Sequence, residues 1–216
     1  MNKPSHQRPT HDAPVRIPVA IAAPHVHLTQ AVIEELFCDK YRLHELSKLV
    51  QPTQYAALES VTLIGPRGRL SNVRVIGPPR SVNQVELSQT DALRLGIDAP
   101  VRESNDLERT PGILVEGPRT RVRIERGVIR ALRHIHMTAS DADRLGFKDG
   151  DRMAVAHERR HGQVLFRDVL VRVSPDCRLE LHLDADEGEA AALHAGDHVI
   201  LHNRTLNRSR RTAYAR

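Results

Sequence analysis

Residues 134–146 read HIHMTASDADRLG, and this short stretch decides the fold more than any other part of the chain. Its first four residues alternate polar and apolar side chains, as a half-buried β-strand does. Thr138 then supplies a helix-capping hydroxyl, Asp141 puts a negative charge near the positive helix end, and Gly146 is a residue that commonly closes a helix. The stretch therefore predicts a strand that turns directly into a short helix.

The same unit recurs: a side chain able to bind a metal, then Leu or Met, then a helix-capping residue. In two of the copies a second histidine (His25 or His134) stands two residues earlier, and alternation along a strand puts both histidines of a pair on one face. Four such turns predict an internal duplication into two barrel-like halves. The copies are His27-Leu28-Thr29, Glu86-Leu87-Ser88, His136-Met137-Thr138 and His182-Leu183-Asp184.

Short β-branched segments separated by Gly-Pro turns make up most of the chain, and the helices are few and short. Many short strands with close turns favour closed barrels over a doubly wound parallel sheet. We therefore predict a mainly β protein. The expected strands cover residues 15–22, 60–64, 73–76, 82–87, 113–116, 122–125, 129–137, 152–156, 164–173 and 178–183.

Charge and aromatic content argue against two classes of protein. The formal net charge is +5, but residues 203–216 hold five arginines and no acidic residue, so the rest of the chain is formally neutral. With three Phe, three Tyr and no Trp, the chain lacks the aromatic platforms on which single-stranded nucleic acids stack. No apolar run approaches the roughly 18 residues of a membrane span. Neither a nucleic-acid-binding body nor a membrane protein is expected.

The chain ends and the cysteines indicate a cytoplasmic protein. The first 16 residues contain no apolar segment of the kind found in secretory signals, and Cys38 and Cys177 are too few for a disulfide framework. A reducing compartment is therefore expected. Residues 1–15 and 204–216 are expected to be disordered because they carry few apolar side chains.

Six side chains are candidates for metal ligation, enough for two catalytic sites with three protein ligands and one open position each. Imidazole-rich sets suit zinc or cobalt better than magnesium. A structural alternative stays open, in which the histidines are ordinary polar residues of half-exposed strands. One natural division has His25, His27 and Glu86 around a first metal and His134, His136 and His182 around a second. The second set carries no negative ligand, so its metal would keep its full charge toward an anion.

Three more polar residues near Glu86 are candidates for substrate binding. Arg80 and Arg102 lie in the segments GPPRSVNQVE and APVRESND on either side of that turn. A guanidinium can bind a phosphate or a carboxylate through two parallel hydrogen bonds. Gln84 shares a strand face with Glu86 and is a candidate for supporting it. Ordinary surface arginines and a plain polar strand residue are the alternatives.

At these residues the chain resembles the PduL-type phosphate acyltransferases, also called phosphotransacylases, which are associated with propanediol degradation and bacterial microcompartments. The similarity extends from about Arg16 to His202 and includes every candidate ligand. The segments that carry it include IPVAIAAPHVHLT, VIGPPRSVNQVELSQTDALRLGIDAPVRES, GVIRALRHIHM and the HLDADE region.

The resemblance implies two β-barrel domains capped by short helices, with a dinuclear zinc site between them in which cobalt is an alternative. One domain covers residues 24–130, and the other joins residues 16–23 to residues 131–203. The implied reaction exchanges an acyl group between coenzyme A and inorganic phosphate, so acyl-CoA, coenzyme A, phosphate and acyl phosphate are the expected partners. A homodimer or higher homo-oligomer is expected, free in the cytoplasm or inside a bacterial microcompartment.

The resemblance also implies roles for the six candidate ligands and for Arg80. The first ligand set holds the metal that meets the coenzyme sulfur, and the second holds the metal that meets phosphate, with Arg80 as the phosphate clamp. Arg102 and Gln84, which are candidates from the residues alone, complete the expected substrate-binding residues.

Two other functions remain open from the sequence. A metal-dependent hydrolase would let water attack the same thioester or a phosphoester, because zinc lowers the pKa of bound water toward about 7. A non-enzyme alternative is a basic binding or scaffold protein that uses the arginine-rich tail.

Overall fold

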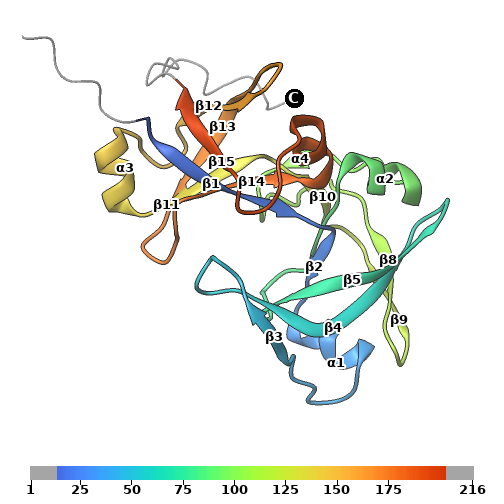
Figure 1. Ribbon diagram of the computed structural model, residues 1–216. Helices are drawn as coiled ribbons and strands as arrows, with labels where there is room; N and C mark the ends of the chain where they lie inside the picture. Colours follow the sequence, from blue (N-terminus) through green and yellow to red (C-terminus); the bar gives the residue numbers. More distant parts are fainter. Residues whose placement is uncertain (1–13, 203–216) are drawn as a thin grey trace, which may run out of the picture.

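The computed structural model describes residues 14–202, and its mainly β architecture confirms the predicted fold class (Figure 1). None of the helices in this part of the chain is long and apolar enough to cross a membrane. The strands are β1 (Arg16–Ala22), β2 (His25–His27), β3 (Glu45–Lys48), β4 (Tyr55–Ile64), β5 (Arg69–Gly77), β6 (Gln84–Glu86), β7 (Val101–Arg102), β8 (Ile113–Glu116), β9 (Arg121–Ile124), β10 (Val128–Ala131), β11 (His134–Met137), β12 (Arg152–Arg159), β13 (Gly162–Val173), β14 (Glu180–Asp184) and β15 (His198–His202). The helices are α1 (Gln30–Leu36), α2 (Gln89–Leu95), α3 (Ala139–Leu145) and α4 (Ala185–Ala191).

The strands form one closed barrel and one open sheet. The barrel has the order β1-β14-β11-β13-β12-β15, and β15 pairs back to β1. The sheet has the order β7-β10-β6-β2-β5-β4-β8-β9, with β3 beside β4. Its edge strands are short, with two residues in β7 and four in β9. They therefore offer few backbone N–H and C=O groups for the pairing that would close the sheet into a barrel. Of the two expected barrels, one is therefore closed and the other is an open sheet.

The barrel and the sheet share a strand order, which supports the predicted internal duplication. β14, β11, β13 and β12 follow one another in the barrel as β6, β2, β5 and β4 do in the sheet. Each half also gives its leading strand to the other: β1 precedes β2 in the chain but pairs with β14, and β10 precedes β11 but pairs with β6. Figure 1 shows β1, in blue, among the orange and red strands. The two halves are interlocked by this exchange.

The single strand expected over residues 129–137 is wrong, because the chain forms two strands there. β10 pairs with β6 of the sheet, whereas β11 pairs with β13 and β14 of the barrel. Leu132 and Arg133 make the crossing between them, so no continuous ladder can pass through these residues. The sequence also gave no sign of β3, whose four residues are all exposed and therefore show no alternation of burial.

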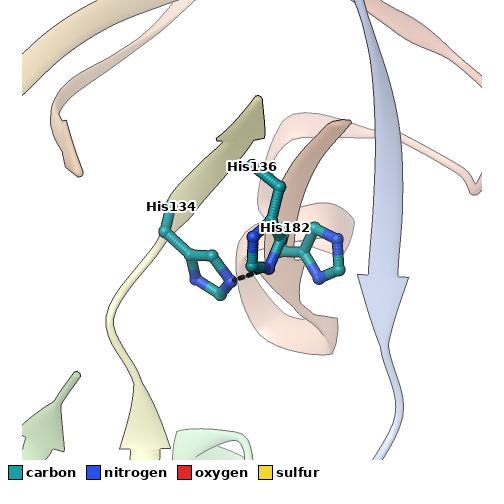
Figure 2. Close-up of side chains that lie close together, drawn as sticks. All are labelled: His134, His136 and His182. Carbon is teal, nitrogen blue, oxygen red and sulfur yellow. Dashed lines mark hydrogen bonds between the residues drawn. The ribbon is translucent and has the colours of Figure 1, made fainter. Parts of the chain in front are cut away.

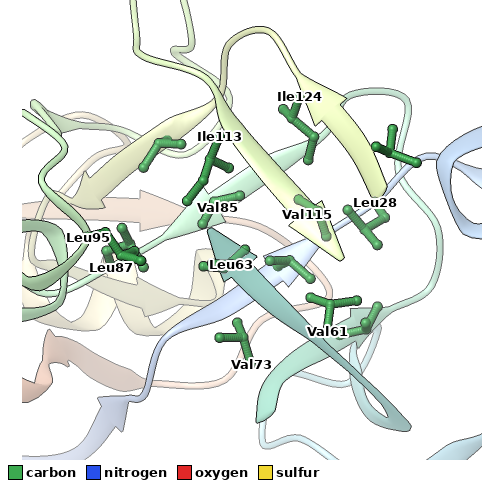
Figure 3. Close-up of a cluster of buried hydrophobic side chains, with 14 of the residues drawn as sticks. Leu28, Val61, Leu63, Val73, Val85, Leu87, Leu95, Ile113, Val115 and Ile124 are labelled. Atoms are coloured by element: carbon green, nitrogen blue, oxygen red, sulfur yellow. The ribbon is translucent and has the colours of Figure 1, made fainter. Parts of the chain in front are cut away.

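Each half has its own hydrophobic core. Figure 3 shows the core of the open sheet, where Leu63, Val85 and Val115 are 0% exposed. In the barrel, Ile135 and Leu181 are equally buried. Both are strand residues that alternate with candidate ligands, so the apolar side chains enter the core while the ligand side chains point to the opposite face.

The four predicted strand-to-helix turns are present. Each cap residue follows a candidate ligand by two positions, so the ligand is fixed relative to the start of its helix. Gly96 and Gly146 end α2 and α3 in the left-handed conformation, with φ values of 72° and 76°, as expected. The cap side chains of Thr29, Ser88, Thr138 and Asp184 accept hydrogen bonds from the backbone N–H groups of Val32, Asp91, Asp141 and Glu187.

Removal of one cap tests how much such a turn contributes to stability. Thr138 Oγ1 accepts a hydrogen bond from Asp141 N at 3.1 Å. Thr138→Ala should lower the free energy of unfolding by about 1 kcal/mol in urea denaturation. Ser140→Ala changes an exposed residue of the same helix and should alter that free energy by less than about 0.5 kcal/mol. Equal effects of the two variants would contradict a capping role for Thr138.

The disorder expected at residues 1–15 and 204–216 concerns residues that lie outside the described part of the chain, except for residues 14 and 15. Within the described part, Val15 accepts a hydrogen bond from Leu201 N at 3.0 Å and packs against the barrel core. The domain boundaries expected at residues 23/24 and 130/131 stay predictions.

Candidate metal centre

A cavity of about 270 Å³ is lined by residues of both the barrel and the open sheet. This volume is near the lower end of the range for small-molecule sites. The wall of the cavity includes all six predicted metal ligands: His25, His27, Glu86, His134, His136 and His182.

Strands β2 and β6 position the first cluster of donors. They pair antiparallel with His25 opposite Glu86, and opposite residues of such a pair project from the same face. His25 Nε2 lies 3.5 Å from Glu86 Oε2, and His27 Nε2 lies 4.0 Å from Glu86 Oε1. One donor atom from each of the three residues lies within 4.8 Å of the other two.

Strands β11 and β14 position the second cluster in the same way. His134 lies opposite His182 in their antiparallel pairing, and His136 lies two residues along β11 on the same face. Figure 2 shows the three rings close to one another, with a contact of 3.2 Å between Nε2 of His134 and Nε2 of His136. The His134 and His182 rings stack at a centroid distance of 5.0 Å. One donor atom of each again lies within 4.8 Å of the others.

Backbone carbonyls orient one histidine of each cluster. His25 Nδ1 donates to Ala23 O and His134 Nδ1 donates to Leu132 O, both at 2.8 Å. Because a carbonyl can only accept, Nδ1 carries the proton and Nε2 of each ring presents a lone pair to its cluster. Hydrogen bonds of this kind are usual behind metal-binding histidines, where they fix the ring orientation.

The spacing of the nitrogens fits a tetrahedral transition-metal site. At a zinc–nitrogen distance of about 2.0–2.1 Å, two ligand nitrogens of a tetrahedron lie about 3.3 Å apart. The Nε2 atoms of His134 and His136 lie 3.2 Å apart. A donor set of five imidazoles and one carboxylate also suits zinc or cobalt better than magnesium. The residues present therefore fit the metals that the sequence indicated.

Burial favours the neutral histidine, which is the form that binds a metal. Burial, followed by the charge of neighbouring His25, lowers the pKa of His27 to about 2. In the second cluster, burial and then the charge of His182 lower the pKa of His134 and of His136 to about 3. The rings are thus available as ligands at neutral pH without losing a proton.

Glu86 is the acidic member of the two clusters. Burial raises the pKa of Glu86, but the charges of His25, His134 and Arg80 together lower it by more. The net pKa therefore lies below the ordinary value. Gln84 is fully buried and donates from Nε2 to Glu86 Oε1 at 2.6 Å. The predicted support of Glu86 by Gln84 therefore has a direct contact.

Two arginines, Arg80 and Arg172, lie in the cavity wall next to the clusters. Arg80 Nη1 donates to Ser104 Oγ at 3.4 Å, and Arg172 lies opposite His136 in the pairing of β13 with β11. The pKa of Arg80 lies below its ordinary value, mainly because of burial. The charge of Glu86 opposes this shift, and the charge of Arg172 adds to it. Two neighbouring guanidinium groups make this side of the cavity suited to an anion.

Comparison with known proteins assigns the chain to a family. A family model described as phosphate propanoyltransferase matches residues 18–194. A phosphate propanoyltransferase of Thermotoga maritima is 49% identical over 183 residues, which cover 85% of this chain and 87% of that protein. Phosphate propanoyltransferases of Salmonella typhimurium and Citrobacter freundii are 48% and 47% identical over 175 residues, 81% of this chain and 83% of each protein. The chain belongs to the phosphate propanoyltransferase family. This finding confirms the resemblance and the expectation of a phosphate acyltransferase enzyme.

The part matched by the phosphate propanoyltransferase model includes both clusters and the two arginines of the cavity wall. Arg102 is not among the residues that line the cavity; its Nε lies 3.6 Å from Asp106 Oδ2, and its side chain is 35% exposed. The structure thus brings Arg80 to the clusters and does not bring Arg102 there. A part for Arg102 in substrate binding stays a prediction.

Several residues around the clusters escaped the sequence analysis. Arg172 lies beside His136 only because β13 pairs with β11, a long-range pairing that the sequence does not reveal. Cys177 was not among the candidate residues, yet its Sγ lies 3.3 Å from His136 Nδ1. Cys177 thus contacts Nδ1 of His136, whereas the Nε2 atom of the same ring contacts His134.

Proposed function

We propose that this protein exchanges an acyl group between coenzyme A and inorganic phosphate, so that acyl-CoA and phosphate give acyl phosphate and free coenzyme A. The observation that carries the proposal is the pair of three-donor clusters that face one cavity beside two arginines. The names of the relatives support propanoyl or another short acyl chain as the transferred group.

We propose that each cluster holds one zinc ion, with cobalt as an alternative. When bound, the two ions would supply positive charge that stabilises a thiolate and the oxygens of phosphate. The clusters differ by one unit of charge because Glu86 belongs only to the first. The uncharged second cluster, with Arg172 beside His136 and Arg80 in the same cavity wall, is therefore the better place for the phosphate dianion.

The residues of the cavity wall bind and orient the two reactants. The guanidinium of Arg80, hydrogen-bonded to Ser104, holds phosphate with one oxygen toward the thioester carbonyl. That oxygen forms the new bond to the acyl carbon, the carbon–sulfur bond breaks, and its electron pair stays on the coenzyme sulfur. Holding both reactants in one small cavity removes much of the entropic cost of their encounter.

Product analysis tests this proposal directly. Purified protein is given propanoyl-CoA with and without inorganic phosphate, while free thiol and acyl phosphate are both measured. We expect thiol release to require phosphate and to match the amount of acyl phosphate, which hydroxylamine traps as a hydroxamate. Thiol release at the same rate without phosphate, with free propanoate as the product, would establish the hydrolase alternative and overturn the proposal.

Further features rest on the sequence and on the resemblance, and are kept as proposals. They are the domain division at residues 23/24 and 130/131, a homodimer or higher homo-oligomer, and a cytoplasmic location that is either free or inside a bacterial microcompartment.

A further inference from the structure

Glu180 is a buried carboxylate next to the second cluster that the proposed chemistry leaves without a role. It lies in β14, two residues before His182 and on the same face, and is 5% exposed. Its Oε2 lies 2.9 Å from His182 Nε2. A buried carboxylate is costly unless it is hydrogen-bonded, so this contact needs an explanation.

The contact fixes which nitrogen of His182 faces the cluster. A carboxylate accepts the hydrogen bond, so Nε2 of His182 carries the proton and Nδ1 presents the lone pair. His134 has the opposite arrangement, because its Nδ1 donates to a carbonyl and its Nε2 faces the cluster. A carboxylate behind a histidine is a known way to orient that ring toward a metal and raise its basicity.

Glu180 is held in turn by a residue of the other half of the molecule. Gln51 lies in the turn between β3 and β4 of the open sheet and is 6% exposed. Its Nε2 donates to Glu180 Oε2 at 3.1 Å and to Arg178 O at 3.3 Å. Its Oε1 accepts from Arg178 N at 3.2 Å. The side-chain amide of Gln51 thus fastens the turn of the open sheet to the barrel strand that carries His182.

We propose that Gln51 and Glu180 are positioning residues that form a relay, Gln51 to Glu180 to His182, which sets the metal affinity of the second cluster. The inference rests on the proposed metal site and deepens it. Through this relay, the packing of residues 49–54 against the barrel determines the metal affinity of the His134–His136–His182 cluster. The two halves of the duplication are therefore coupled at the centre itself as well as through their exchanged strands.

The test measures zinc affinity by chelator competition in a His25→Ala background. The first cluster has lost a ligand in this background, so the zinc ion that stays tightly bound belongs to the second cluster. Glu180→Gln and Gln51→Ala should each weaken that affinity by about 10–100-fold. In the double variant, Gln51→Ala should add less than about 2-fold, because it acts through Glu180. The visible absorption spectrum of the cobalt form should change in Glu180→Gln, a readout that is independent of activity.

Two matched controls separate a relay from a general loss of stability. Glu59 is also buried, at 7% exposure, and its Oε1 lies 2.7 Å from His44 Nδ1, but His44 belongs to neither donor cluster. Thr53 is an exposed residue of the same turn as Gln51. Glu59→Gln and Thr53→Ala should leave the zinc affinity unchanged, and thermal unfolding of the metal-free proteins shows that each variant is folded.

The outcomes distinguish this inference from the proposed function. Wild-type affinity in both Glu180→Gln and Gln51→Ala, or equal weakening by Glu59→Gln, overturns the relay while acyl transfer by the wild-type protein still supports the function. Weakened affinity in the two relay variants, with a wild-type protein that makes no acyl phosphate, supports the relay and overturns the function. A wild-type chain that binds no zinc overturns both.

Discussion

Replacing His134 by alanine is expected to reduce the rate of acyl transfer by about three orders of magnitude or more, because loss of one metal site removes several kcal/mol of charge stabilisation. His134 is central to the second cluster: its Nε2 lies 3.2 Å from that of His136, and its ring stacks on His182. The rate is measured as phosphate-dependent thiol release from propanoyl-CoA.

His161→Ala is the matched control for this variant. His161 is an exposed residue of the turn between β12 and β13, away from the cavity wall, and its loss should leave the rate within about 2-fold of the wild-type value. Full activity of His134→Ala would contradict the assignment of the second cluster to the reaction.

Replacing Arg80 by alanine is expected to lower kcat/KM for phosphate by about 100-fold or more. Hydrogen bonds to charged groups contribute about 1.5–3 kcal/mol each, and Arg80 can form two with one phosphate. The KM for acyl-CoA should change little, because the guanidinium acts on the other reactant. Steady-state kinetics with phosphate and acyl-CoA varied in turn measure both quantities.

Arg102→Ala shows whether the sequence or the structure gives the better guide to the phosphate site. Both arginines flank Glu86 in the sequence, but only Arg80 is in the cavity wall. We therefore expect Arg102→Ala to change kcat/KM for phosphate by less than about 3-fold. A large loss in Arg102→Ala together with a small loss in Arg80→Ala would contradict the proposed phosphate site.

The local part of the fold could be predicted because it depends on residues close in sequence. Thr138, Asp141 and Gly146 specify where α3 begins and ends, and the helix has these limits. The pairing of distant strands could not be predicted in this way. The crossing at Leu132 and Arg133 depends on β10 and β11 belonging to different sheets, which no local pattern records.

The candidate ligands could be predicted because the repeated unit marks them. Four of them stand before an apolar residue and a cap, and His25 and His134 each stand two residues before one of these four. Alternation sends the apolar neighbours into a core. The residues that hold the candidate ligands through hydrogen bonds show no such sequence pattern. Gln51 and Glu180 are separated by 129 positions and meet only because the turn before β4 packs against β14.

The difference in charge between the two clusters arises at one pair of matching positions in the duplication. Glu86 and His182 occupy matching positions, each opposite the first histidine of an HxH strand. A single change of residue type at this position makes one cluster anionic and leaves the other neutral. We infer that this difference allows one cavity to receive a thiol on one side and an oxyanion on the other.

Metal analysis of the purified protein tests the central claim most directly. The two clusters predict about two equivalents of zinc or another transition metal per chain for the wild-type protein, and about one for His27→Ala and for His134→Ala. A wild-type protein without transition metal would contradict the account. Single variants that retain both equivalents would contradict it equally.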